Sequence, residues 1–160
     1  MGVITKVWKH ETADKLYCEE IDVGEAEPRL IASGLVPYYT QEQMLGRRLI
    51  VVCNLKPKNL VGFKSHGMVL CASQTAEDGS LRVEFVDPPS SSAPGDRLFG
   101  EGLTSGPFTA GQCDKRKCFE VVAADLMVDA QGVARWKALA LVNDKGETCS
   151  APTLRSVHIH

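Results

Sequence analysis

Residues 43–76 carry five cations and no carboxylate. The cations are Arg47, Arg48, Lys56, Lys58 and Lys64. Cations held near one another suit the binding of phosphate groups, because each neutralised phosphate releases counterions and adds to the affinity. The simpler alternative is that they are ordinary solvated side chains on a surface loop. Charge alone favours this alternative, so the phosphate-binding interpretation needs further support.

A second basic cluster consists of Lys115, Arg116 and Lys117. Apolar residues spaced three and four apart predict a helix over residues 114–126, which places the cluster at its first turn. Cations at that end oppose the helix dipole and do not stabilise the helix. The cluster is therefore a weaker candidate for nucleic-acid binding, with a solvated surface run as the alternative.

Residues that bind metals or catalyse reactions are sparse in this chain. The six cysteines form no CxxC pair, so the spacing of a zinc site is absent. No GxSxG, P-loop or GxGxxG motif occurs. We therefore expect no catalysis, no metal and no cofactor. His158 and His160 are expected to belong to a frayed end rather than to a site.

Few aromatic side chains are available to stack on unpaired nucleobases. The candidates are Trp8, Tyr17, Tyr38, Tyr39 and Phe63. Phe63 is favoured because it lies inside the basic run, where a bound phosphate backbone would bring bases near it. A loop residue that anchors to the core is an equally good interpretation of Phe63.

The elements that must position these residues are mostly short strands. Partial alternation or short apolar runs predict strands over residues 2–7, 16–23, 29–33, 48–53, 67–72 and 81–86. One small helix is expected between them, capped by Thr40 with Gln43 in the capping box and closed by Gly46. Short strands with one small helix predict a small β-barrel.

Two Gly-, Ser- and Pro-rich stretches, over residues 87–96 and 100–111, divide the chain. We expect a barrel over residues 1–99 and an α+β extension over residues 100–160. Two hairpin turns are expected in the extension, at residues 129–132 and 143–146.

The formal net charge of −2 and the pI near 6.1 exclude a uniformly basic nucleic-acid protein. The sum conceals an uneven distribution, since the first 42 residues hold four cations against eight carboxylates. Cys53 and Cys71 lie in apolar runs, which favours reduced thiols in the cytoplasm. The start MGVITKV lacks the pattern of a signal peptide, and no apolar run is long enough for a transmembrane helix.

Several ordered motifs resemble one known family. They are Lys9–Tyr17, Glu20–Gly24, Ser33–Val36, Asn54–Pro57, the spaced set Gly62, Ser65, Met68 and Ala72, and the segments Pro88–Pro89 and Pro94–Arg97. The chain is similar to the EMAP-II-like (endothelial-monocyte-activating-polypeptide-II-like) tRNA-binding domains appended to aminoacyl-tRNA synthetases or their complex cofactors. The resemblance is strong over residues 2–99 and weaker from Lys115 onward.

The resemblance implies a mainly β fold, an OB-fold five-stranded β-barrel with an EMAP-II-like α+β extension packed against it. It implies a non-catalytic module that binds tRNA by structure and phosphate contacts and delivers it to a linked or associated aminoacyl-tRNA synthetase. The isolated domain is expected to be a monomer without a membrane partner. The alternative is a protein-interaction or cytokine-like module of a multi-synthetase complex.

The resemblance also points to individual residues. Lys56, Lys58 and Lys64 would contact phosphates, and Asn54 and Ser65 would form hydrogen bonds with the RNA. Arg47, Arg48, Phe63, Lys115, Arg116 and Lys117 complete the candidate set. The chain departs from many relatives before Gly62, where Val61 replaces a cation.

Overall fold

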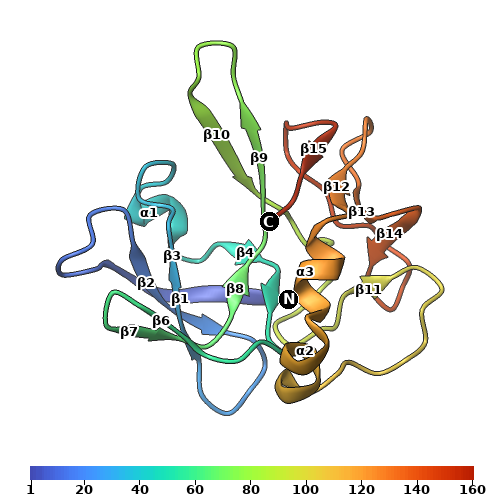
Figure 1. Cartoon of the computed structure of the whole chain (residues 1–160), viewed down its shortest axis with the longest axis horizontal. Coiled ribbons are helices and arrows are strands. Elements are labelled where there is room, and N and C mark those ends of the chain that lie inside the picture. The colour runs from blue at the N-terminus through green and yellow to red at the C-terminus, as the bar shows by residue number, and fades with distance from the viewer.

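The chain folds mainly as antiparallel β-structure, which confirms the prediction of a mainly β fold. We describe it from a computed structural model that covers residues 1–160. The first half contains a curled sheet in the strand order β3-β2-β1-β4, and the second half lies beside it (Figure 1). The strands of this sheet are β1 (Gly2–Lys9), β2 (Tyr17–Asp22), β3 (Arg29–Ser33) and β4 (Arg48–Leu49).

A bulge in β1 decides which side chains face the core and which face solvent. The pairing with β2 shifts register between Ile4 and Lys6. Because of this extra residue, Ile4 and Val7 both pack in the first core, although they are three positions apart. Lys6 and Trp8, two positions apart, lie together on the outer surface.

The two apolar runs expected as single strands are each interrupted once. They form β4 and β5 (Val51–Val52), and β8 (Met68–Val69) and β9 (Cys71–Thr75). β5 pairs with β8, whereas β9 pairs with β10 (Leu81–Phe85) in a long projecting hairpin (Figure 1). At the two breaks, the Leu70 amide donates to the Ile50 carbonyl at 3.0 Å, and both side chains turn into the second core.

A hairpin that the sequence analysis treated as a loop lies between these runs. It consists of β6 (Lys58–Leu60) and β7 (Phe63–Ser65). Val61 and Gly62 make its turn with φ values of 51° and 85°, and the Gly62 amide donates to Asn59 Oδ1 at 2.7 Å. β7 lies against β3, where the His66 amide donates to the Leu30 carbonyl at 2.8 Å.

The short helix α1 (Gln41–Met44) begins and ends as predicted. Thr40 accepts a hydrogen bond from the Gln43 amide, and the Gln43 side chain accepts one from the Thr40 amide. Gly46 follows the helix with a φ of 76°, a conformation that glycine adopts without strain. Met44 is buried in the first core and fixes the helix to the sheet.

The second half contains two helices and a five-stranded sheet in the order β11-β14-β13-β12-β15. Its elements are β11 (Phe99–Gly100), α2 (Ala110–Arg116), α3 (Cys118–Ala123), β12 (Leu126–Val128), β13 (Ala134–Trp136), β14 (Leu139–Val142) and β15 (Val157–His158). The expected turn at residues 129–132 joins β12 to β13. The expected turn at residues 143–146 directly follows β14 and is closed by a backbone hydrogen bond from Gly146 to Asn143.

The prediction of one helix over residues 114–126 is wrong. A capping box of Thr109 and Gln112 starts α2 earlier, and Lys117 breaks the path in the left-handed conformation, with a φ of 50°. Lys115 and Arg116 therefore occupy the last turn of α2 rather than a first turn. Cations at that end stabilise the helix dipole, so the argument from an opposed dipole does not hold.

The prediction of a frayed C-terminal end is also wrong, because the last residues form backbone hydrogen bonds with a neighbouring segment on each side. β15 pairs with β12, and Cys71 and His160 exchange two backbone hydrogen bonds of 2.8 Å. Ile159 between them is buried. The terminal strand thus joins the second half of the chain to β9 of the first half.

Two apolar cores hold the structure together. The first lies within the curled sheet and includes Ile4, Ile31 and Phe85. The second core combines Ile50, Leu70, Ala72 and Val86 from the first half of the chain with residues of the second half. Both halves therefore contribute to this core. All six cysteines are free thiols. None of the three helices has the length and the apolar composition that a membrane-spanning helix needs.

Candidate nucleic-acid interface

The β6–β7 hairpin presents two unpaired lysines to solvent. Lys58 and Lys64 are exposed, and neither forms an ion pair or a side-chain hydrogen bond. Lys58 is opposite Ser65, and Asn59 is opposite Lys64. Opposed residues of an antiparallel pair share a face, so the two lysines lie on opposite faces of the hairpin. A phosphate backbone that crosses the hairpin can therefore meet a cation on either side.

The segment before the hairpin is docked on α2. The Lys56 ammonium lies 2.6 Å from Asp114 Oδ2, and both side chains are more than half exposed. Asn54 Nδ2 donates to the Phe108 carbonyl at 2.9 Å and to Cys113 Sγ at 3.3 Å. An exposed ion pair contributes little stability, so a phosphate can compete with Asp114 for Lys56. The Asn54 amide, in contrast, already has its partners within the chain.

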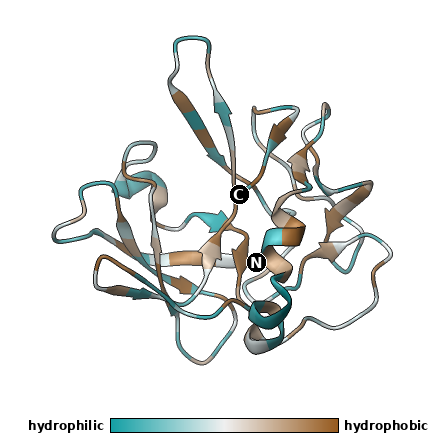
Figure 2. Cartoon of the chain, viewed as in Figure 1, coloured by the Kyte–Doolittle hydropathy of each residue, from teal (hydrophilic) through white to brown (hydrophobic).

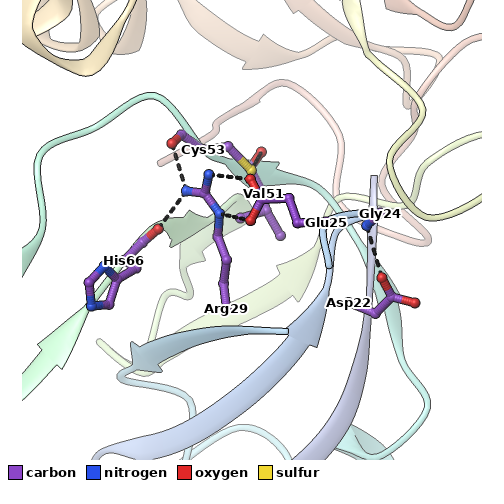
Figure 3. Close-up of polar contacts among 7 residues, drawn as sticks. All are labelled: Asp22, Gly24, Glu25, Arg29, Val51, Cys53 and His66. Atoms are coloured by element: carbon purple, nitrogen blue, oxygen red, sulfur yellow. Dashed lines mark hydrogen bonds and ion pairs between the residues drawn. The ribbon is translucent and has the colours of Figure 1, made fainter. Parts of the chain in front are cut away.

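Arg29 fixes the two ends of the segment that carries these lysines. Its guanidinium donates to the Cys53 carbonyl at 2.7 Å and to the His66 carbonyl at 2.8 Å, and it forms two hydrogen bonds with Glu25 (Figure 3). The bond from Arg29 holds the pKa of the Glu25 carboxyl below its usual value. The sequence analysis missed this positioning residue, because a lone arginine in a strand has no distinctive spacing.

Arg47 and Arg48 brace the connection between the halves. Arg47 lies 2.7 Å from Asp87 Oδ1 and over the Phe85 ring at 5.1 Å. Burial raises the pKa of the Asp87 carboxyl, while Arg47 acts in the opposite direction. Arg48 donates to three carbonyls, those of Pro89, Ser90 and Ser92, at 2.7–3.0 Å. Both guanidinium groups have internal partners, so the expected contact of this pair with RNA would have to compete with these bonds.

Ser65 is likewise an internal residue. Its side chain is buried, its Oγ accepts from the Ala32 amide at 3.1 Å, and it donates to the Gly67 carbonyl at 3.0 Å. Ser65 therefore ties β7 to β3, and its expected hydrogen bond to RNA would compete with these two internal bonds.

The second basic cluster is exposed at the junction of α2 and α3. Lys115 and Lys117 have no ion-pair partner, and the Arg116 guanidinium lies 4.8 Å from the Phe108 ring centre. Figure 2 shows α2 as one of the most hydrophilic segments. Because Asp114 pairs with Lys56, this helix end adjoins the segment that leads into β6. We call Lys56, Lys58, Lys64, Lys115, Arg116 and Lys117 the basic surface.

Phe63 lies beside a second aromatic residue. Its ring centre is 6.2 Å from that of Trp8, with an angle of 73° between the planes. Both rings are half-buried. The other aromatic candidates are engaged elsewhere, since Tyr17 is buried and Tyr38 and Tyr39 pack against the first core. The surface thus combines cations with one aromatic pair.

The exposed cations make this part of the surface suited to an anionic ligand. No group of three or more histidine, cysteine, aspartate or glutamate side chains is arranged to hold a metal ion. The cations of the basic surface point to a ligand with several phosphates.

Comparisons with known proteins agree on one family. The profile of a family described as "Putative tRNA binding domain" matches residues 1–97. The chain is 45% identical over 150 residues to the cytoplasmic tyrosine–tRNA ligase of Danio rerio, which covers 93% of this chain and 28% of that protein. It is 42% identical over 159 residues to the cytoplasmic methionine–tRNA ligase of Caenorhabditis elegans, and this match covers 99% of this chain and 17% of that protein.

Two further relatives are not named as ligases. The chain is 40% identical over 155 residues to aminoacyl tRNA synthase complex-interacting multifunctional protein 1 of Mus musculus, covering 96% of this chain and 48% of that protein. Among solved structures, the C-terminal domain of Plasmodium vivax p43 superposes with a TM-score of 0.87 at 36% identity, covering 99% of this chain and 93% of that one. The chain thus spans less than half the length of these curated relatives.

Proposed function

Because the chain belongs to the putative tRNA-binding domain family, we propose that it is a non-catalytic module that binds tRNA through phosphate contacts. The observation that carries the proposal is the family match over residues 1–97 together with the unpaired lysines of the β6–β7 hairpin. Unpaired cations gain the full counterion-release contribution, because they give up no internal partner on binding.

The residues of the basic surface take different parts in this proposal. Lys58 and Lys64 contact phosphates directly, and Lys56 does so after it leaves Asp114. Lys115, Arg116 and Lys117 extend the contact along the second half of the chain. Asn54 and Ser65 position the hairpin and its leading segment, since their polar groups are used within the chain.

Finer features of the fold follow from the same family. We infer that the curled sheet, with β5, β8, β9 and β10, is an OB-fold five-stranded barrel over residues 1–99, and that residues 100–160 are its EMAP-II-like extension. OB-folds bind nucleic acids on their sheet and loops, which is consistent with a ligand at the hairpin. We also place the protein in the cytoplasm, where the named ligase relatives act.

Binding of this kind makes a linked enzyme more efficient through effective concentration. A weak site beside a synthetase active site raises the local tRNA concentration without new catalytic contacts. We therefore propose an aminoacyl-tRNA synthetase, in the same chain or in a complex, as the second partner. The names of the ligase relatives and of the mouse complex-interacting protein support this proposal.

Fluorescence anisotropy with labelled tRNA tests the binding. The wild-type chain should bind several tRNAs with similar affinity, and Lys58→Ala with Lys64→Ala should weaken all of them alike. Lys145→Ala is the matched control, because Lys145 is an exposed lysine without an ion pair on a distant turn. No binding of wild-type protein at tens of micromolar, or an equal effect of the control, would overturn the proposal.

An interaction module of a synthetase complex is the second candidate, favoured by the name of the mouse relative. Affinity capture of a synthetase with the immobilised chain, before and after nuclease treatment, separates the two functions. Capture that survives nuclease supports a direct protein contact, whereas capture that disappears supports a tRNA bridge.

A further inference from the structure

The aromatic pair of Trp8 and Phe63 lies at the surface beside the charged side chain of Lys6. Trp8 comes from the outer face of β1, and Phe63 comes from β7, far along the chain. Their T-shaped contact, with ring centres 6.2 Å apart, holds each ring in a fixed position. The rings are only half-buried, so part of each remains accessible to a ligand.

One face of Trp8 is covered by a side chain that can leave. The Lys6 ammonium lies 5.2 Å from the centre of the Trp8 ring. Its side chain is 65% exposed, and its ion pair with Glu20 is long, at 3.7 Å. Such a contact costs little to break, because exposed pairs and exposed cation–π contacts each contribute at most about 1 kcal/mol. Lys6 can therefore move from the ring to a nearby phosphate.

The size of this site argues for a nucleobase rather than a protein partner. A stable protein interface buries about 800 Å² on each side, whereas two half-buried rings offer only a small area. A single base needs one ring face and a cation for its phosphate. Lys6 lies over Trp8, and the exposed Lys58 shares the face of the β6–β7 hairpin that carries Phe63, so a cation is available beside each ring.

We propose that Trp8, supported by Phe63, stacks on an unpaired nucleobase of the bound RNA, while Lys6 neutralises an adjacent phosphate. This inference rests on the proposed function and adds a ligand class to it. Phosphate contacts alone accept any duplex, but a stacking site requires a base outside a helix. The chain therefore prefers RNA with single-stranded nucleotides, such as tRNA, over a blunt RNA duplex with the same number of phosphates.

Fluorescence of Trp8 reports the stacking directly. The chain has two tryptophans, and Trp136→Phe leaves Trp8 as the only one. This background is a mild change, because Trp136 Nε1 is buried without a hydrogen-bond partner. A short oligoadenylate and tRNA should both quench the Trp8 emission, and the blunt duplex should not. Equal quenching by the duplex, or none by any RNA that binds, would overturn the stacking.

Affinity measurements give an independent test. Trp8→Ala should weaken tRNA binding by at least about fivefold and leave duplex binding unchanged, since a stacked base contributes about 1–3 kcal/mol. Trp8→Phe should retain most of the affinity and keeps an aromatic ring under Lys6. Lys6→Ala should make the slope of log affinity against log salt shallower by the amount that one phosphate contact contributes. The RNA should still quench the Trp8 emission in this variant.

The outcomes separate this inference from the proposed function. If wild-type protein binds tRNA with salt dependence but Trp8→Ala changes tRNA and duplex binding equally, only the stacking site is refuted. If wild-type protein binds no RNA, the proposed function fails as well. Should Trp8→Ala not fold, the quenching in the Trp136→Phe protein still decides, because it contains the native Trp8.

Discussion

A buried carboxyl in β2 leads to a sharp prediction about stability and pH. The Glu19 side chain is fully buried in the curled sheet, and the Ser33 hydroxyl donates to its Oε1. Its Oε2 has no hydrogen-bond partner. Burial raises the pKa of the Glu19 carboxyl from 4.5 to about 8, although the bond from Ser33 acts in the opposite direction. The folded chain therefore keeps this carboxyl protonated at neutral pH.

The direction of the pH effect follows from the proton balance. Between pH 4.5 and 8 the folded state holds a proton on Glu19 that the unfolded state has released. The free energy of unfolding is therefore highest below pH 4.5 for this group and falls as the pH rises, by about 1.4 kcal/mol per pH unit. From pH 5 to pH 7 the loss is about 2.5 kcal/mol, slightly less than the full slope because the unfolded carboxyl is still partly protonated at pH 5.

Urea denaturation of wild type and Glu19→Gln at several pH values measures this loss. Glutamine is neutral throughout and can accept the bond from Ser33, so Glu19→Gln should lack the decrease and be the more stable protein at pH 7. Glu20→Gln is the control, because Glu20 is a partly exposed residue paired with Lys6. Parallel pH profiles of wild type and Glu19→Gln would refute the reasoning.

Further substitutions test the contacts around the interface and between the halves. Asp114→Asn should strengthen tRNA binding by up to about fivefold at unchanged melting temperature, since it frees Lys56; anisotropy titrations would show it. Arg29→Ala should lower the free energy of unfolding by about 2–3 kcal/mol in urea, because two carbonyls lose a charged donor. Ile159→Ala should cost about 2–5 kcal/mol in the same assay, whereas Val121→Ala, at an exposed position, should stay within about 0.5 kcal/mol.

Local sequence rules predicted the elements that depend on local contacts. The strand over residues 29–33 has the expected bounds, and the capping box at Thr40 is present. The β6–β7 hairpin escaped prediction because its strands have three residues each and its turn places Val61 at a φ of 51°. Valine is among the least favourable residues for that conformation, so no turn pattern marked the site.

Other misses depend on contacts between distant residues. Lys117 ends α2 in a left-handed conformation, and a lysine in the sequence does not predict that conformation. The terminal strand is held by Cys71, which lies far away in the sequence. The two-residue strand β15 has too little pattern of its own to be recognised.

The candidate site shows the same division. Composition located the cations but could not tell which of them already have a partner. Arg47 and Arg48 brace the segment after β10, whereas Lys58 and Lys64 are free. Only the tertiary structure separates these two kinds of cation.

The salt dependence of tRNA affinity tests the central claim most directly. The slope of log affinity against log salt should be steep for wild type and shallower by about 1.5 for the protein with Lys58→Ala and Lys64→Ala, because two phosphate contacts are lost. Lys145→Ala should keep the wild-type slope. A double variant with the wild-type slope and affinity would contradict the account, since the hairpin lysines would then not contact the phosphates.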